Sequence, residues 1–172
     1  MFSGMIQRRV GAALRPPTLG MTTTRRDFRA AVVFHGCGVY DGTEITESVA
    51  LLVGLSRIGA EYQIYAPNRD QAHVVNHLTG EEEANPRNVM SESARIARGN
   101  VKDLKDLRAS GYDALIIPGG FGAAKNLCSF GFDGANMKVQ PDIEKVFKDF
   151  RSSNKIIGLT CIAPIIAAKV FG

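Results

Sequence analysis

The sequence is poor in the residues that build metal centres and disulfide frameworks. Its 172 residues include three cysteines, three histidines and no tryptophan. Cys37, Cys128 and Cys161 are odd in number, and neither they nor the histidines follow a zinc-ligand spacing. We therefore expect no disulfide framework, no metal site and no bound cofactor, and we interpret Cys37 and Cys128 as small packing residues.

Long apolar runs and a basic domain are also missing. No stretch approaches the ~20 consecutive apolar residues that cross a bilayer, so no membrane partner is expected. Residues 1–26 contain five arginines and no acid, which leaves 16 basic and 17 acidic residues in the rest of the chain. The pI of about 9.1 therefore describes the N-terminus rather than the domain, and a nucleic-acid partner is not expected.

The N-terminal segment, residues 1–28, mixes arginine with small and apolar residues. This composition is typical of a mitochondrial transit peptide and predicts a protein of the mitochondrial matrix. The alternative is a solvated basic arm. Residues 29–172 are long enough for one domain with a hydrophobic core.

Apolar runs and helical patterns alternate along this domain. Buried strands are expected at 29–34, 61–66, 113–117 and 156–160, and helices at 43–58 and 141–152. The pattern predicts an α/β fold, a doubly wound parallel sheet with helices on both faces. The middle is less regular. There we expect short strands at 73–78 and 88–90, and a helix at 91–98 capped by Ser91.

In open parallel sheets the working crevice lies beyond the carboxyl ends of the strands. Three such ends carry informative residues: the loop 35–42, the run Pro118-Gly119-Gly120, and Cys161. The apolar run before Cys161 stops at the thiol, and a helix-forming run starts at Ile162. A strand that turns into a helix at a cysteine resembles a nucleophile elbow, so Cys161 is the predicted nucleophile.

The glycine pair offers backbone groups to the same crevice. Glycine permits positive φ and leaves its amide unshielded, so the N–H groups of Gly120 and Ile162 could form an oxyanion hole. The alternative for Gly119-Gly120 is an ordinary tight turn after a strand. A phosphate-binding loop would need a Lys-Ser/Thr pair after the glycines, and none follows.

Glu47 is the candidate carboxylate partner of the thiol. Asp41 and Glu44 fit a capping box, with Asp41 as the N-cap. Glu47 lies one turn further along the helix, where it could hydrogen-bond Cys161; the alternative is a solvated helix charge. Nucleophilic cysteines usually have a nearby histidine base, and only His35 is expected near the crevice, with a packing role as the alternative.

The two remaining histidines, His73 and His77, lie four residues apart in a polar segment. We expect both to be surface residues.

Three segments, 36–45, 116–127 and 158–164, resemble the DJ-1/PfpI superfamily of the class I glutamine amidotransferase-like fold. From about Ala30 onward the chain resembles the branch that contains the bacterial ElbB and mitochondrial ES1 proteins. The resemblance implies a flavodoxin-like sandwich, a homodimer and a reactive Cys161. It also implies that members of the branch continue beyond Gly172, so we expect the C-terminal part of the domain to be missing.

The same resemblance implies a helix glutamate at Glu47 and oxyanion amides at Gly120 and Ile162. The expected function is cofactor-independent, cysteine-dependent chemistry of the glyoxalase or hydrolase type on small reactive carbonyls such as glyoxals. The alternative is a non-catalytic mitochondrial protein whose thiol senses oxidation or whose surface binds partners. Glutamine amidotransferase chemistry comes third, because it needs a histidine-glutamate pair after the cysteine.

Overall fold

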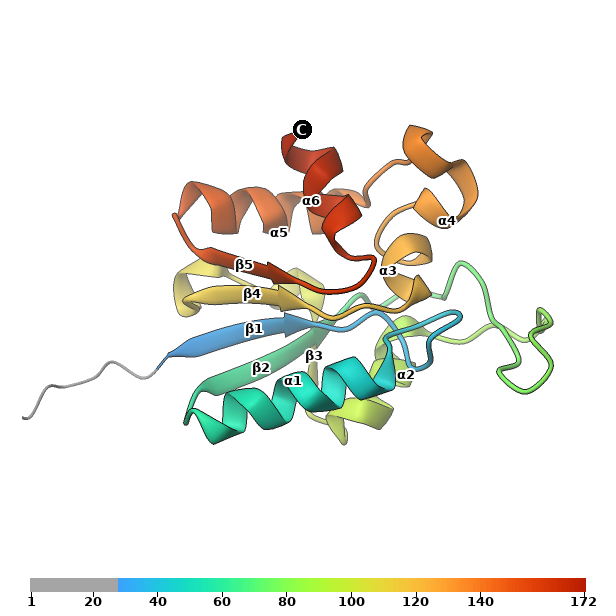
Figure 1. The fold of residues 1–172 in the computed structure, drawn as a ribbon, viewed down its shortest axis with the longest axis horizontal. Coiled ribbons are helices and arrows are strands. Elements are labelled where there is room, and N and C mark those ends of the chain that lie inside the picture. The colour runs from blue at the N-terminus through green and yellow to red at the C-terminus, as the bar shows by residue number, and fades with distance from the viewer. Residues whose placement is uncertain (1–27) are drawn as a thin grey trace, which may run out of the picture.

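The computed structural model describes residues 28–172 and contains one five-stranded, all-parallel sheet (Figure 1). The strand order is β3-β2-β1-β4-β5, so β1, β4 and β5 are neighbours. The strands are β1 (Arg29–Val33), β2 (Glu61–Ala66), β3 (Val101–Asp103), β4 (Ala114–Ile117) and β5 (Ile156–Leu159).

Helices cover both faces of this sheet (Figure 1). One face packs against α1 and α2, and the other packs against α5 and α6. The α-helices are α1 (Ile45–Arg57), α2 (Val89–Ala97), α3 (Phe121–Lys125), α4 (Phe130–Asp133), α5 (Pro141–Ser152) and α6 (Pro164–Phe171). Residues 28–172 also contain three short 3-10 helices, η1 (Leu104–Asp106), η2 (Ala109–Gly111) and η3 (Gly134–Asn136).

The central strand β1 explains why the sheet is buried on both sides. Ala30 and Val32 belong to the core on the α1/α2 side, whereas Ala31 and Val33 belong to the core on the α5/α6 side. All four are fully buried. Alternating side chains that are apolar on both faces give the continuous hydrophobic run seen in the sequence.

The fold class and the main elements were predicted correctly. The strands expected at 29–34, 61–66, 113–117 and 156–160 and the helices at 43–58 and 141–152 are all present, with ends that shift by up to two residues. The predicted leader falls on residues 1–27, which lie outside the described residues, and on Phe28.

The middle of the chain differs from the prediction. Residues 73–78 and 88–90 form isolated antiparallel bridges, Val75 to Glu82 and Asp70 to Asn88, rather than strands. The helix begins at Val89 and its N-cap is Asn88, so the assignment of Ser91 as the cap is wrong. The Asn88 side chain accepts a hydrogen bond from the Ser91 N–H at 3.0 Å. This bond satisfies an amide of the first helical turn that has no partner within the helix.

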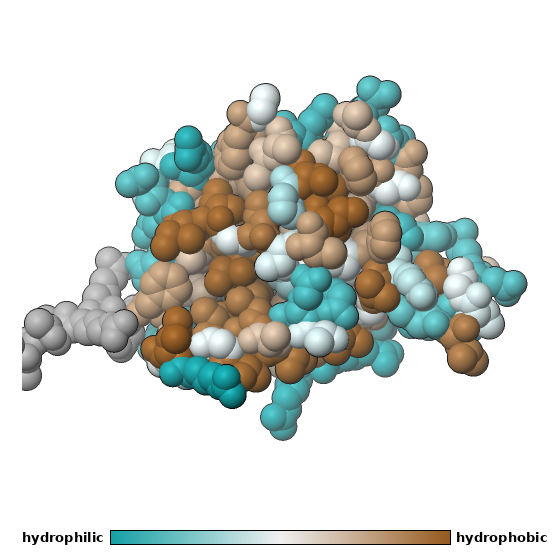
Figure 2. Space-filling view, viewed as in Figure 1, coloured by the Kyte–Doolittle hydropathy of each residue, from teal (hydrophilic) through white to brown (hydrophobic). Residues whose placement is uncertain are grey.

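The visible face of the molecule in Figure 2 is largely hydrophobic over α1 and the strands above it. On α1 the exposed side chains Ile45, Val49 and Val53 follow one another at four-residue intervals. Ile156 on β5 is 60% exposed. Within residues 28–172, no helix combines the length and the hydropathy needed to cross a membrane.

Candidate active site

The loops after β1 and β4 are joined by backbone hydrogen bonds. The Glu44 N–H donates to the Gly119 carbonyl at 2.8 Å, and the Gly122 N–H donates to the Gly42 carbonyl at 3.0 Å. Gly120 has a φ of +105°, and a Cβ there would lie 2.3 Å from the Gly42 oxygen. The two loops therefore approach each other so closely that only glycine fits at Gly120.

Cys161 lies two residues after the end of β5, on an exposed turn. Its φ is +56°, in the left-handed region that non-glycine residues rarely adopt. Such a backbone conformation costs about 1–3 kcal/mol and concentrates at functional sites. This is the geometry of the predicted elbow.

The helix after Cys161 begins later than predicted. Its first residue is Pro164, which has no N–H, and the Ala163 N–H instead closes a turn onto the Thr160 carbonyl at 3.0 Å. The helix expected from Ile162 therefore starts two residues later, after a turn that spans residues 161–163. Proline fits the first helical position because the amide there needs no intrahelical partner.

The Glu47 carboxylate lies beside the Cys161 thiol. Its Oε2 accepts the Gly119 N–H at 2.9 Å and the Thr160 hydroxyl at 2.5 Å. Partial burial works to raise the pKa of the Glu47 carboxyl. Hydrogen bonds from Thr160, Gly119 and the Cys161 thiol outweigh it, so the pKa is lowered. Glu47 is therefore a carboxylate aimed at Cys161 rather than a solvated helix charge.

Gly119 is what allows this approach. A Cβ at Gly119 would lie 2.2 Å from the Cys161 Cβ and 2.8 Å from the Glu47 Oε2. No side chain fits in that space. Both glycines are therefore required by close contacts within the site, which an ordinary tight turn would not require.

The two predicted oxyanion donors are backbone amides at this rim. Among residues 28–172, the N–H groups of Gly120 and Ile162 donate to no protein acceptor, whereas the neighbouring Gly119 and Ala163 amides both do. Unpaired N–H groups beside a nucleophile are available to an incoming oxygen atom. Their use as an oxyanion hole stays a prediction.

The predicted capping box is wrong. Glu44 itself is the N-cap of α1, and its side chain accepts the Glu47 N–H at 2.5 Å. Asp41 is buried and accepts the Val75 N–H at 2.8 Å. The helix begins four residues after Asp41, and the Asp41 side chain satisfies a buried amide of the 70–88 segment instead.

His35 lies beneath the rim and takes the packing role that was its alternative. It is fully buried, and its Nε2 lies 3.0 Å from the Pro118 carbonyl. Since a carbonyl only accepts, Nε2 carries the proton. Burial lowers the pKa of His35 to about 4, so the ring is neutral near pH 7. No described hydrogen bond joins an imidazole to Cys161.

The buried His35 makes stability depend on pH. Its pKa falls from 6.5 unfolded to about 4 folded, so the unfolded chain binds the extra proton between these values. The stabilisation is complete above pH 6.5 and is lost as pH falls toward 4, by about 3 kcal/mol in all. We expect urea midpoints to fall over this window, and His35→Gln to flatten the slope. An equal slope in both proteins would contradict this.

One residue of the site was missed in the sequence. Thr160 stands directly before the candidate nucleophile, and this position could have indicated it.

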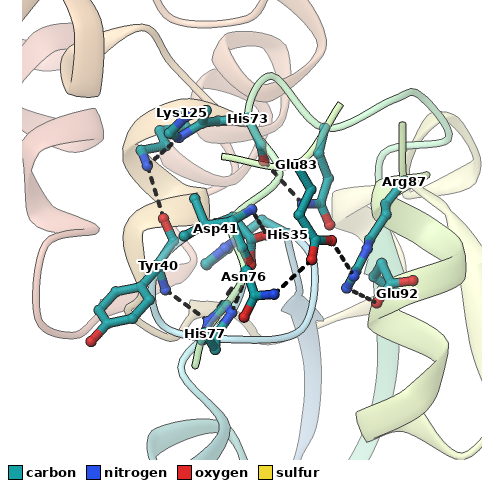
Figure 3. A network of polar contacts seen from close by, with 12 residues as sticks. His35, Tyr40, Asp41, His73, Asn76, His77, Glu83, Arg87, Glu92 and Lys125 are labelled. Carbon is teal, nitrogen blue, oxygen red and sulfur yellow. Dashed lines mark hydrogen bonds and ion pairs between the residues drawn. The ribbon is translucent and has the colours of Figure 1, made fainter. Parts of the chain in front are cut away.

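His73 and His77 lie outside this site. His77 is exposed, as expected, and His73 is half-buried. His73 lies 2.8 Å from the Lys125 Nζ, and His77 stacks on Tyr40 with ring centroids 4.8 Å apart (Figure 3).

Cys128 is buried, as expected of a packing residue, and Cys37 is half-buried. No group of three or more His, Cys, Asp or Glu side chains in the described part of the chain could hold a metal ion.

Several known proteins have sequences similar to that of this chain. The chain is 55% identical over 153 residues to the human "glutamine amidotransferase-like class 1 domain-containing protein 3, mitochondrial". It is 57% identical over 143 residues to the rat "ES1 protein homolog, mitochondrial". These matches cover 88% and 83% of this chain but 57% and 54% of the relatives. The chain thus spans just over half the length of the relatives it matches. No protein-family model matches it.

Solved structures agree with the sequence relatives. An isoprenoid biosynthesis protein with an amidotransferase-like domain from Ehrlichia chaffeensis superposes with a TM-score of 0.79 at 38% identity, covering 83% of this chain and 68% of that one. A two-domain protein from Anabaena variabilis with a DJ-1/ThiJ/PfpI-like domain has the same fold, with a TM-score of 0.51 at 15% identity, covering 84% of this chain and 32% of that one.

The fold and the matches define a glutamine amidotransferase-like class 1 domain, whose fold is shared with the DJ-1/ThiJ/PfpI-like domain of the Anabaena protein. Within this class the chain belongs to the ES1 family, whose human, rat and zebrafish members are named mitochondrial.

Proposed function

We propose that this chain is a cysteine-dependent enzyme of the mitochondrial matrix that acts on small reactive carbonyls such as glyoxals. The observation that carries the proposal is the carboxylate of Glu47, which is held by Thr160 and Gly119 and interacts with the Cys161 thiol. A fixed carboxylate beside an exposed thiol can take its proton and return it, which is the work of a general base and acid.

The reaction follows from the positions of these groups. Glu47 takes the Cys161 proton, and the thiolate sulfur forms a bond to one aldehyde carbon of glyoxal. The carbonyl electron pair moves to its oxygen, which the Gly120 and Ile162 amides stabilise as a hemithioacetal oxyanion. Glu47 gives this proton to the oxyanion, and the carboxylate then removes the hydrogen of the sulfur-bound carbon as a proton and delivers it to the second carbon. The hydroxyl proton of the first carbon moves to the oxygen of the second, which leaves a thioester. Water hydrolyses the thioester and restores the thiol, so glyoxal plus water gives glycolic acid, with one carbon oxidised and the other reduced.

Turnover of glyoxal and methylglyoxal by the purified chain tests this proposal. The discriminating comparison is between the natural chain and Cys161→Ser. Hydroxy-acid product formed by the natural chain alone supports it. Equal turnover by both proteins would refute it.

A second candidate function is a non-catalytic thiol that senses oxidation. The observation in its favour is that Cys161 is exposed while the imidazole nearest the rim, His35, is buried and bonded to Pro118. In this case peroxide oxidises Cys161 well before Cys37 and Cys128, because burial raises the pKa of both other thiols. Mass spectrometry of each cysteine measures the order, and oxidation of all three at one rate would exclude a sensor.

The homodimer is a further part of the proposal. The exposed apolar stripe of Ile45, Val49 and Val53 on α1 offers a second copy a hydrophobic surface. Sedimentation velocity of the natural chain and of Val49→Glu checks it. We expect a dimer that the charged substitution weakens, and a monomer at micromolar concentration would contradict it.

A further inference from the structure

A second cluster of reactive side chains lies at α3 and shares no residue with the Cys161 site. The Lys125 Nζ lies 2.9 Å from the Tyr40 carbonyl and 2.8 Å from the His73 Nδ1 (Figure 3). On its other side, His73 places Nε2 3.2 Å from the Glu82 Oε2. Carboxylate, imidazole and amine therefore stand in one row, brought together from the 70–88 segment and α3.

The direction of these hydrogen bonds follows from the chemistry of the groups. An ammonium group only donates, so the His73 Nδ1 accepts from Lys125, and Nε2 carries the hydrogen that faces Glu82. This is the arrangement in which a carboxylate orients an imidazole toward a nucleophile. His73 can take a proton from Lys125, and Glu82 stabilises the imidazolium that results.

The amine opens into a cavity of about 260 Å³ that Tyr40, Val75 and Phe121 line together with it. The Phe121 ring centroid lies 5.6 Å from the Lys125 Nζ. A Cβ at Gly131 would lie 2.9 Å from the Lys125 Cγ, so the glycine there leaves room for the lysine stem. A small, partly aromatic cavity with one amine suits a small apolar or aromatic ligand that reacts with amines.

The electrostatic surroundings support a reactive amine. Burial lowers the pKa of Lys125, while the charges of Asp41 and Glu82 work in the opposite direction without reversing it. Lys105 gives a contrast, because its bond to Asp103 at 3.1 Å raises its pKa. The free amine, which is the nucleophile, is therefore more populated at Lys125 than at Lys105 near pH 7.

We propose that Lys125 forms an imine with small apolar or aromatic aldehydes, with His73 as the base that accepts the ammonium proton. The amine nitrogen forms a bond to the aldehyde carbon, and the carbonyl oxygen takes the proton from His73 to give a carbinolamine. That step returns His73 to the neutral state. A proton of the carbinolamine nitrogen then moves to the hydroxyl, which leaves as water while the C=N bond forms. The balance is one ammonium and one aldehyde giving one protonated imine and one water, with no oxidant or reductant.

Reductive trapping tests the proposal. The chain is treated at pH 7 with benzaldehyde and sodium cyanoborohydride, in the Cys161→Ser background so that no elbow thiol competes. Peptide mass spectrometry then follows benzylation at Lys125 and, as the matched control, at the exposed Lys105. We expect benzylation of Lys125 to be at least about tenfold faster than that of Lys105. This threshold is set below the rate increase of about 10²–10⁴-fold that a positioned general base contributes.

Two variants separate His73 from a merely exposed amine. His73→Gln and Glu82→Gln should each slow benzylation of Lys125 and leave Lys105 unchanged, with circular dichroism confirming that each variant folds. Glu82 has a 66% exposed side chain, so its substitution keeps the test available if His73→Gln unfolds. Equal rates at Lys125 and Lys105, or an unchanged ratio in the folded variants, would overturn the proposal. Neither result depends on glyoxal turnover.

Discussion

Cys161→Ser should lower glyoxal turnover by at least about 10³-fold while leaving the fold intact. A serine hydroxyl occupies nearly the same space on the exposed turn, but it ionises far less readily than a thiol. Steady-state measurement of hydroxy-acid product gives the fold-change, and circular dichroism gives the fold.

Glu47→Gln is the companion to that experiment. The amide keeps the size of the carboxylate and can still accept from Gly119 and Thr160, but it cannot take the thiol proton. We expect turnover to fall by about 10²–10⁴-fold, the range for a positioned general base. Cys37→Ser is the matched control, since burial raises the pKa of that thiol, and it should keep full activity. A loss in Cys37→Ser equal to that in Cys161→Ser would refute the assignment.

Gly119→Ala should disrupt the site through packing alone. Its methyl group would meet the Cys161 Cβ at 2.2 Å and the Glu47 Oε2 at 2.8 Å, so the elbow or the start of α1 must move. Overpacking of this kind lowers the free energy of unfolding by about 1–3 kcal/mol. The change also displaces the Gly119 N–H, which donates a hydrogen bond to Glu47. Urea denaturation measures the free energy of unfolding, and the rate of Cys161 alkylation against pH reports the thiol.

Gly54→Ala is the control for that substitution. Gly54 lies within α1, and a Cβ there meets no atom within 4 Å. Alanine in the middle of a helix should raise the free energy of unfolding by about 0.5–1 kcal/mol and leave thiol reactivity unchanged. A Gly119→Ala protein as stable and as reactive as the natural chain would show that the elbow can relax without loss.

Most of the fold could be predicted from the continuous apolar runs that form the strands. β1, β2, β4 and β5 are largely apolar runs bounded by turn residues, so hydrophobicity alone places them, although β5 is only partly buried. β3 has three residues and α3 has five, too few to show a period of two or of 3.6. The 70–88 segment is held by hydrogen bonds with distant residues, such as the one that the Val75 N–H donates to the Asp41 carboxylate, and no local pattern reveals them.

The candidate site was predictable where local geometry decides it. Cys161 and Gly120 stand at strand ends, and the topology brings those ends together. The hydroxyl of Thr160 became visible only once α1 had placed Glu47 opposite it, across 113 residues of sequence. His73 and Lys125 were missed for the same reason, because their contact joins α3 to the 70–88 segment.

The left-handed backbone at Cys161 sets stability against reactivity at one residue. Glycine adopts a φ of +56° without strain, and cysteine does not. Selection for heat resistance alone would therefore favour glycine here, which keeps the turn and removes the thiol. A relative with glycine at this position would retain the fold but could not carry out the proposed cysteine chemistry.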